Sequence, residues 1–99
     1  MWHEERLFIN GELRDAKDGS TFDNINPATG EILGVSADAS QSDFDDAVAA
    51  ARSAFDSSVW STDLSLRVRC LEQLHVALQG HVEELSALTV AEVGATQMA

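Results

Sequence analysis

The stretch NINPATGEILGV, Asn24–Val35, decides the local fold, because it places a sharp turn between two apolar runs. The residue before a proline avoids the helical region, and Pro27 fixes its own φ. Gly30 supplies a residue that tolerates positive φ just before the chain becomes apolar again. The stretch therefore predicts a strand, a turn and a second strand.

Similar turn chemistry divides the residues before this stretch. Asn10-Gly11 separates two short apolar runs, which is typical of a type I′ hairpin because both residues tolerate positive φ. Asp18-Gly19 marks the next turn. The predicted strands are, in order, residues 7–9, 12–14, 21–25 and 31–36. We expect these strands to form a small antiparallel meander over residues 6–36.

Helical periodicity begins in the sequence DASQSDFDDAV. Ser40 followed by Asp43 resembles a capping box, and acidic residues in the first turn favour the positive end of the helix dipole. We predict a helix over residues 41–57. Its apolar stripe has the spacing i, i+4, i+7, i+11 and consists of Phe44, Val48, Ala51 and Phe55.

A second helix is predicted over residues 63–93, with Asp63 or Ser61 as its cap and Gly94 as its stop. A glycine inside a helix costs about 1 kcal/mol relative to alanine, so Gly80 allows a bend or a break in LQGHVEEL. An unbroken helix would be roughly 45 Å long. A compact body of this size is only about 26 Å across. The sequence therefore indicates a piece of something larger, or a subunit of an assembly.

Composition limits the class of partner. The 99 residues carry a formal net charge of −11 and are 44% hydrophobic, enough for one small domain with a modest core. The excess of acids disfavours nucleic acid and anionic membranes as partners. The start, MWHEERLF, lacks the apolar region of a signal peptide, and no apolar run reaches bilayer length. These features lead us to expect a cytoplasmic protein.

Residues that could carry chemistry favour structural roles. Cys70 has neighbouring arginines but no base fixed beside it, so a packed thiol is the preferred interpretation. His75 and His81 are six residues apart, which separates them by about 120° around a helix. No cysteine or third histidine stands at ligand spacing, so solvated or packing histidines are the preferred interpretation. Trp2 and Trp60 are interpreted as core or interface anchors. The residues by themselves predict no catalytic constellation.

Three separated segments resemble the N-terminal part of the aldehyde dehydrogenase superfamily. They are LFINGELRDAKDGSTFDNINPATGEILG, DFDDAVAAARSAFDSSVWS and LRVRCLEQLHVALQGHVEELSALTVAEVGA, and they occur in the order seen in that family. The resemblance implies that the α+β elements over residues 1–99 belong to the N-terminal part of the α/β dehydrogenase fold and form an incomplete domain. Members of this family oxidise an aldehyde to a carboxylic acid with NAD or NADP.

The resemblance also implies where the catalytic, cofactor-binding and cation-binding residues lie. It implies that the nucleophilic cysteine, the general base and the nucleotide-binding strands lie downstream, so no residue here inherits a catalytic or cofactor-binding role. Some members bind a monovalent cation, K⁺ or Na⁺, through backbone carbonyls. The matching positions are Asn24, Ile25 and Glu92.

Two functions remain open at this point. In the first, the chain is the N-terminal portion of a dehydrogenase, inactive alone, whose partners are the remainder of that fold or other subunits. In the second, it is a standalone acidic interaction module that dimerises or docks on a related enzyme through exposed leucines and valines.

Overall fold

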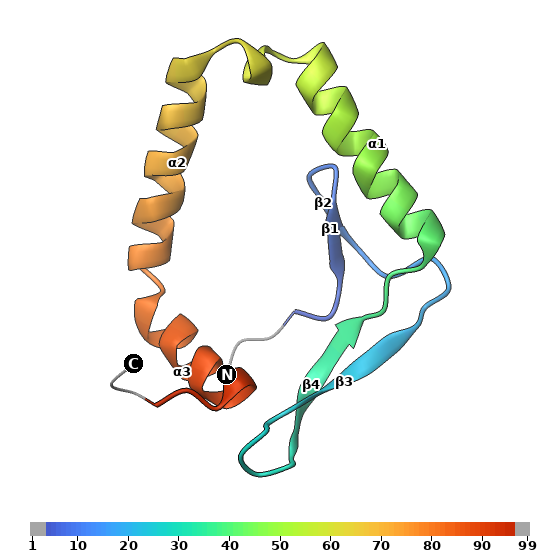
Figure 1. Cartoon of the computed structure of the whole chain (residues 1–99), viewed down its shortest axis with the longest axis vertical. Helices are drawn as coiled ribbons and strands as arrows, with labels where there is room; N and C mark the ends of the chain where they lie inside the picture. The colour runs from blue at the N-terminus through green and yellow to red at the C-terminus, as the bar shows by residue number, and fades with distance from the viewer. Residues whose placement is uncertain (1–3, 97–99) are drawn as a thin grey trace.

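The computed structural model describes residues 4–96, which form two short hairpins followed by helices. Figure 1 shows these elements arranged as an open frame, with α1 and α2 forming two of its sides. The architecture confirms the predicted α+β class. The elements are β1 (Leu7–Ile9), β2 (Glu12–Arg14), β3 (Thr21–Ile25), β4 (Ile32–Ala37), α1 (Gln41–Ser57), the 3₁₀ turn η1 (Val59–Ser61), α2 (Leu64–Gln79) and α3 (Val82–Val93).

The first hairpin pairs β1 and β2 in antiparallel register, with Leu7 opposite Arg14. Its turn residues have positive φ, 54° at Asn10 and 78° at Gly11. A type I′ turn requires this geometry at both central positions. The hairpin predicted from Asn10-Gly11 is therefore confirmed.

The four strands do not form one meander, which corrects that expectation. β3 pairs with β4 in a second, separate two-stranded sheet. The reason lies in the connection between β2 and β3. Ala16 is buried, and the backbone N–H of Lys17 donates to both carboxylate oxygens of Asp43 at 3.2 Å. The connection is thus held against the start of α1 and does not turn β3 back onto β2.

Helix α1 spans the range predicted for it and begins with the predicted capping box. The Asp43 N–H donates to Ser40 Oγ at 3.2 Å, and the Ser40 N–H donates to Asp43 Oδ2 at 3.0 Å. Two backbone donors that a helix start leaves unpaired are satisfied in this way. The local sequence therefore fixes where α1 begins.

The helix predicted over residues 63–93 is two helices, α2 and α3, and the break falls at Gly80-His81. Gly80 closes α2 by donating to the carbonyl of Val76 at 3.1 Å. His81 then leaves helical geometry, with φ −121° and ψ 17°. The weak helix propensity of glycine explains why the periodic pattern is interrupted here.

The outer ends of the two helices follow the sequence signals. Asp63 caps α2, because its Oδ1 accepts from the Leu66 N–H at 3.0 Å. Gly94 ends α3 in the left-handed conformation, with φ 71°. Of the two predicted caps, Asp63 is the one used.

The frame has almost no interior. Its radius of gyration is 16.8 Å and its shortest extent is 16 Å, whereas a compact chain of this length has a radius near 13 Å. Among the described residues only Ala16, Asp43 and Ala91 are buried. The exposed surface is 7608 Å², and a compact monomer of 10.7 kDa would expose about 5,500 Å². Roughly 2,000 Å² of surface therefore lacks the cover that a compact domain would give it.

Candidate functional site

A cluster of charged side chains joins the first hairpin to α1. Its centre is Asp43, whose side chain is fully buried. Arg14 Nη2 donates to Asp43 Oδ1 at 2.9 Å and to Asp46 Oδ2 at 3.1 Å. Lys17 Nζ lies 2.9 Å from the same Asp46 oxygen. Two carboxylates of one helix thus hold two cations of the preceding segment, and the cluster fixes the position of α1 relative to the first hairpin.

These contacts favour the charged carboxylates. The pKa of Asp43 is lowered chiefly by the hydrogen bond from the Ser40 backbone N–H, with further contributions from the Ser40 hydroxyl, Lys17 and Arg14. The pKa of Asp46 is lowered by hydrogen bonds from the side chains of Lys17 and Arg14. Since both carboxylates are paired with cations, the cluster stabilises the fold, and the Nε of Arg14 is its one buried donor that has no partner among the described residues.

A second junction joins the hairpin β3–β4 to α3. Asn24 Nδ2 donates to Glu92 Oε1 at 2.9 Å, although 68 residues separate the two. Beside it, the chain at Gly94 runs close to the predicted turn: a Cβ built on Gly94 would lie 3.4 Å from Pro27 Cγ. The NINPATG stretch therefore forms the surface against which α3 ends.

Two of the three cation candidates meet at this junction. The side chains of Asn24 and Glu92 are in direct contact, and Ile25 follows Asn24 at a register shift in the β3–β4 ladder. Such a shift disrupts the ladder locally, and each carbonyl has two lone pairs, so nearby carbonyls retain capacity for another partner.

The other candidate residues stand apart from one another. Cys70 is half-buried in α2, while His75 and His81 are exposed. His81 Nδ1 lies 3.3 Å from Glu84 Oε2 on the surface of α3. No group of three or more histidine, cysteine or acidic side chains with metal-binding geometry occurs among residues 4–96. Trp60 is 40% exposed in η1, and Trp2 lies outside the described residues.

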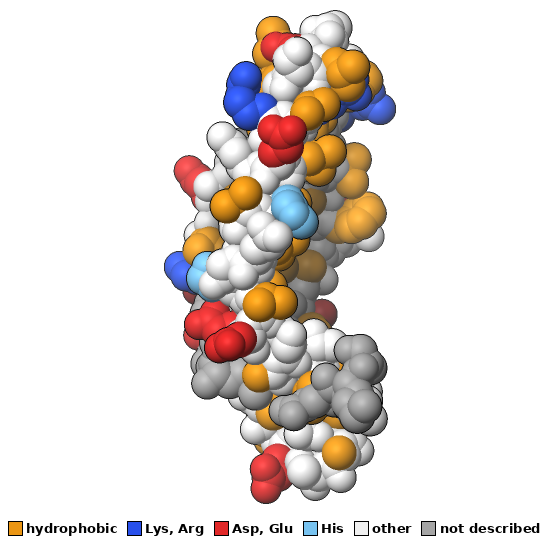
Figure 2. All heavy atoms as spheres, turned by 90° about the vertical axis from the view of Figure 1, so that its left-hand side faces the viewer, with side chains coloured by type: hydrophobic (Ala, Val, Ile, Leu, Met, Phe, Trp, Pro, Cys, Tyr) orange, Lys and Arg blue, Asp and Glu red, His pale blue; other side chains and the backbone are white. Residues whose placement is uncertain are grey.

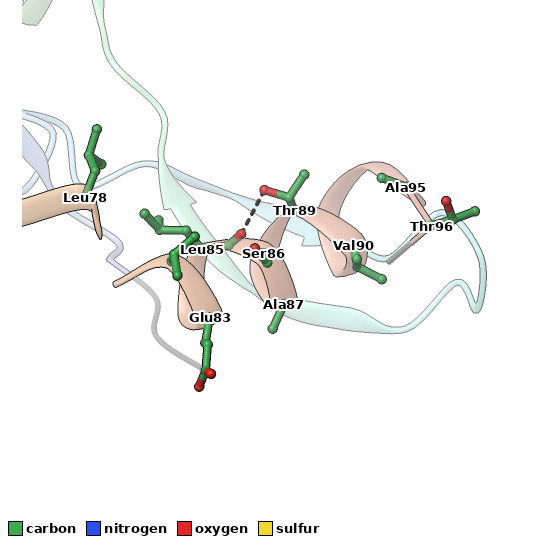
Figure 3. Close-up of a pocket in the computed structure, with 10 residues that line it drawn as sticks. Leu78, Glu83, Leu85, Ser86, Ala87, Thr89, Val90, Ala95 and Thr96 are labelled. Atoms are coloured by element: carbon green, nitrogen blue, oxygen red, sulfur yellow. Dashed lines mark hydrogen bonds between the residues drawn. The ribbon is translucent and has the colours of Figure 1, made fainter. Parts of the chain in front are cut away.

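A hollow of about 650 Å³ lies along α3, between the end of α2 and residues 95–96 (Figure 3). Figure 3 shows its side chains fanning out from α3 without converging on one point. The Thr89 hydroxyl is occupied, since it donates to the carbonyl of Leu85 at 2.8 Å. Ligand sites combine an apolar wall with convergent polar groups. This hollow is a strip of uncovered apolar helix surface and lacks such convergence.

Dinucleotide binding needs parallel strands with a crossover helix, whose N-terminus meets the pyrophosphate. Both strand pairs that the structure describes are antiparallel hairpins. The described elements therefore do not fit NAD, and they supply no nucleophile paired with a base.

No helix within residues 4–96 has the length and apolar content to cross a bilayer.

The two-hairpin frame recurs in solved dehydrogenases. The NAD⁺ complex of an aldehyde dehydrogenase from Bacillus cereus matches with a TM-score of 0.84 and 40% identity, covering 90% of this chain and 18% of that one. A betaine aldehyde dehydrogenase from Staphylococcus aureus, also solved with NAD⁺, matches with a TM-score of 0.89 and 28% identity, covering 95% and 19%. The fold is that of the N-terminal part of these enzymes.

The sequence comparisons identify the same class. Aldehyde dehydrogenase 1 of Tanacetum cinerariifolium is 39% identical over 90 residues, which are 90% of this chain and 18% of that protein. Residues 13–99 match the aldehyde dehydrogenase family. The chain belongs to the aldehyde dehydrogenase family, and it spans about a fifth of the length of the relatives it matches.

The contacts of Asp43 with Arg14 and Lys17 were not predicted from the sequence. It indicated the capping box but gave no sign that this carboxylate would be buried by Arg14 and Lys17, 29 and 26 residues earlier. The available signal was an arginine at the end of β2 and a lysine in the connection to β3, in a chain with only six lysine and arginine residues.

Proposed function

We propose that this chain forms the N-terminal portion of an aldehyde dehydrogenase, which oxidises an aldehyde to a carboxylic acid with NAD⁺ or NADP⁺. The observation that carries the proposal is the family match over residues 13–99 in a frame that exposes roughly 2,000 Å² more surface than a compact domain of its size. The relatives, about five times as long, have room for a nucleophile and a nucleotide site that these residues do not contain.

In this proposal the chain acts as a scaffold. The Asp43 cluster holds the first hairpin on α1, and the Asn24–Glu92 contact holds the second hairpin on α3. The part of the enzyme beyond these residues would hold the dinucleotide, whose chemistry would be to take up a hydride. The chain's contribution is to support the body that binds it, with the rest of that body and further subunits as partners in the cytoplasm. Nucleic acid and membranes are not expected partners, given the net charge of −11.

We further propose a K⁺ or Na⁺ ion at the backbone carbonyls of Asn24, Ile25 and Glu92, supported by the contact between the first and last of these. The test is the unfolding midpoint in KCl or NaCl against choline chloride at the same ionic strength. A higher midpoint in K⁺ or Na⁺ supports a site, because a ligand that binds only the folded state stabilises it. Equal midpoints would exclude it.

The main proposal is tested by measuring the size and activity of the native polypeptide in its source cells. Mass spectrometry should find peptides that continue past Ala99 in one polypeptide several times larger than 10.7 kDa. The purified species should reduce NAD⁺ or NADP⁺ when an aldehyde is added. A discrete 10.7 kDa species without this activity would contradict the proposal and favour the non-catalytic interaction module.

A further inference from the structure

Most side chains that could take part in a reaction stand alone on the frame. Figure 2, which faces α2, shows the histidine side chains on this side apart from one another. The tip of the first hairpin is different. There Asn10 and Gly11 place a side-chain amide next to a backbone nitrogen in one exposed turn. The turn therefore contains both partners of an intramolecular reaction.

Asn10 differs from the other two asparagines of the chain in the contacts of its side chain. The amide of Asn24 donates to Glu92 Oε1 at 2.9 Å, and Oδ1 of Asn26 accepts from the Ala28 N–H at 2.8 Å. Asn10 is exposed, and its side chain makes no hydrogen bond within residues 4–96. A reaction at its amide therefore breaks no contact in the described part of the chain.

The residue that follows each asparagine supplies the backbone nitrogen. Pro27 follows Asn26 and has no N–H. Ile25 follows Asn24, and its β-branched side chain crowds the backbone beside it. Gly11 has no side chain, and a Cβ built there would meet no other atom within 4 Å. Its N–H has no backbone partner among the described residues. Of the three, the nitrogen of Gly11 is thus the most accessible.

The hairpin also allows the backbone rotation that the reaction needs. Positive φ at both turn residues keeps the Gly11 nitrogen in a type I′ turn, so this turn must open before the nitrogen can reach the amide carbon of Asn10. Each strand has only three residues, and two-stranded hairpins are marginally stable. The hairpin is held to α1 at Arg14, which pairs with Leu7 at the opposite end. The tip can therefore open while the base stays in place.

We propose that Asn10 is a site of spontaneous deamidation, in which the backbone nitrogen of Gly11 attacks the side-chain amide carbon of Asn10. The new N–C bond closes a succinimide ring. The bond from that carbon to the side-chain nitrogen breaks, and this nitrogen leaves as ammonia with the proton of the Gly11 N–H. Water then opens the ring at either carbonyl and gives aspartate or isoaspartate. Each product adds a negative charge to a chain that already carries −11.

The two products have different effects on the hairpin. Asp-Gly also suits a type I′ turn, so aspartate at this position leaves the turn intact. Isoaspartate carries the backbone through the former side chain and lengthens it by a carbon. Because turn geometry sets the register of a hairpin, the longer turn no longer matches the pairing of Ile9 with Glu12. We expect isoaspartate to loosen β1 and β2.

The test is to age the native polypeptide, purified from its source cells, in warm and mildly alkaline buffer. Peptide mass spectrometry then follows the conversion of each asparagine to an acid. Asn10 should react at least about tenfold faster than Asn24, because Asn24 must first lose its bond to a carboxylate, which accounts for roughly that factor. Equal rates at the two positions would overturn the proposal. It is also overturned if Asn10 reacts in urea but stays unmodified in the native protein.

Asn10→Gly is the matched control for the effect on the hairpin. Gly-Gly also suits a type I′ turn, so this variant keeps the turn and lacks the amide. Ageing should speed amide hydrogen exchange in residues 7–14 of the wild type and leave the variant unchanged, because exchange reports local opening. An equal change in both would count against deamidation as the cause. None of these outcomes bears on the dehydrogenase function, because the reaction needs only the hairpin and water.

Discussion

Replacing Ser40 with alanine tests whether the capping box sets the stability of α1. Ser40 Oγ accepts from the Asp43 N–H at 3.2 Å and donates to Asp43 Oδ2 at 2.9 Å. Alanine removes both contacts and leaves a helix-start donor without an acceptor. Loss of such a cap costs about 1 kcal/mol. The substitution should therefore lower the free energy of unfolding by about 1 kcal/mol, and the melting temperature with it.

The assay is thermal unfolding of the 99-residue chain, followed by circular dichroism at 222 nm and pH 7. Ser53→Ala is the matched control, because Ser53 is exposed in the middle of α1. There alanine is the better helix former, so the same substitution should raise the melting temperature slightly. Ser40→Gly should cost only a few tenths of a kcal/mol, since glycine is accepted at this cap position. The reasoning is refuted if the Ser40→Ala variant has the same melting temperature as the wild type, or if its melting temperature changes in the same direction as that of Ser53→Ala.

Three further predictions concern the loss of stability at low pH and the glycines that end α3 and α2. The pKa values of Asp43 and Asp46 are lowered in the folded state, so the stability that these carboxylates contribute is present above about pH 4 and is lost as the pH falls through the folded-state pKa values. Urea unfolding should show this loss between pH 7 and pH 2, and no comparable loss between pH 7 and pH 5. Gly94→Ala should destabilise α3 by about 1 kcal/mol, because alanine must adopt φ 71° with its Cβ against Pro27, and an unchanged urea midpoint would contradict this. Gly80→Ala should instead stabilise by about 0.4–1 kcal/mol and raise helicity, because Gly80 is already helical at φ −69° and ψ −15°; a drop in the circular dichroism signal would contradict this.

Local sequence determined most elements of the frame. Asn10-Gly11 fixed the first turn because both residues accept positive φ, and the Ser40 capping box fixed the start of α1. Gly94 fixed the end of α3 for the same reason as the first turn. These signals act within a few residues, so they can be read without knowing the rest of the fold.

Only the tertiary structure decided how the elements are joined. The strands separate into two hairpins because Lys17 donates to Asp43, and β3 meets α3 because Asn24 reaches Glu92. Both contacts link residues that are 26 or more positions apart, and no local pattern specifies such pairs. The long apolar pattern over residues 63–93 was periodic enough for one helix, but the glycine at position 80 allowed it to break. The apolar face of α2 can be predicted from the spacing of its leucines and valines. Only the tertiary structure shows that these side chains are exposed in this chain.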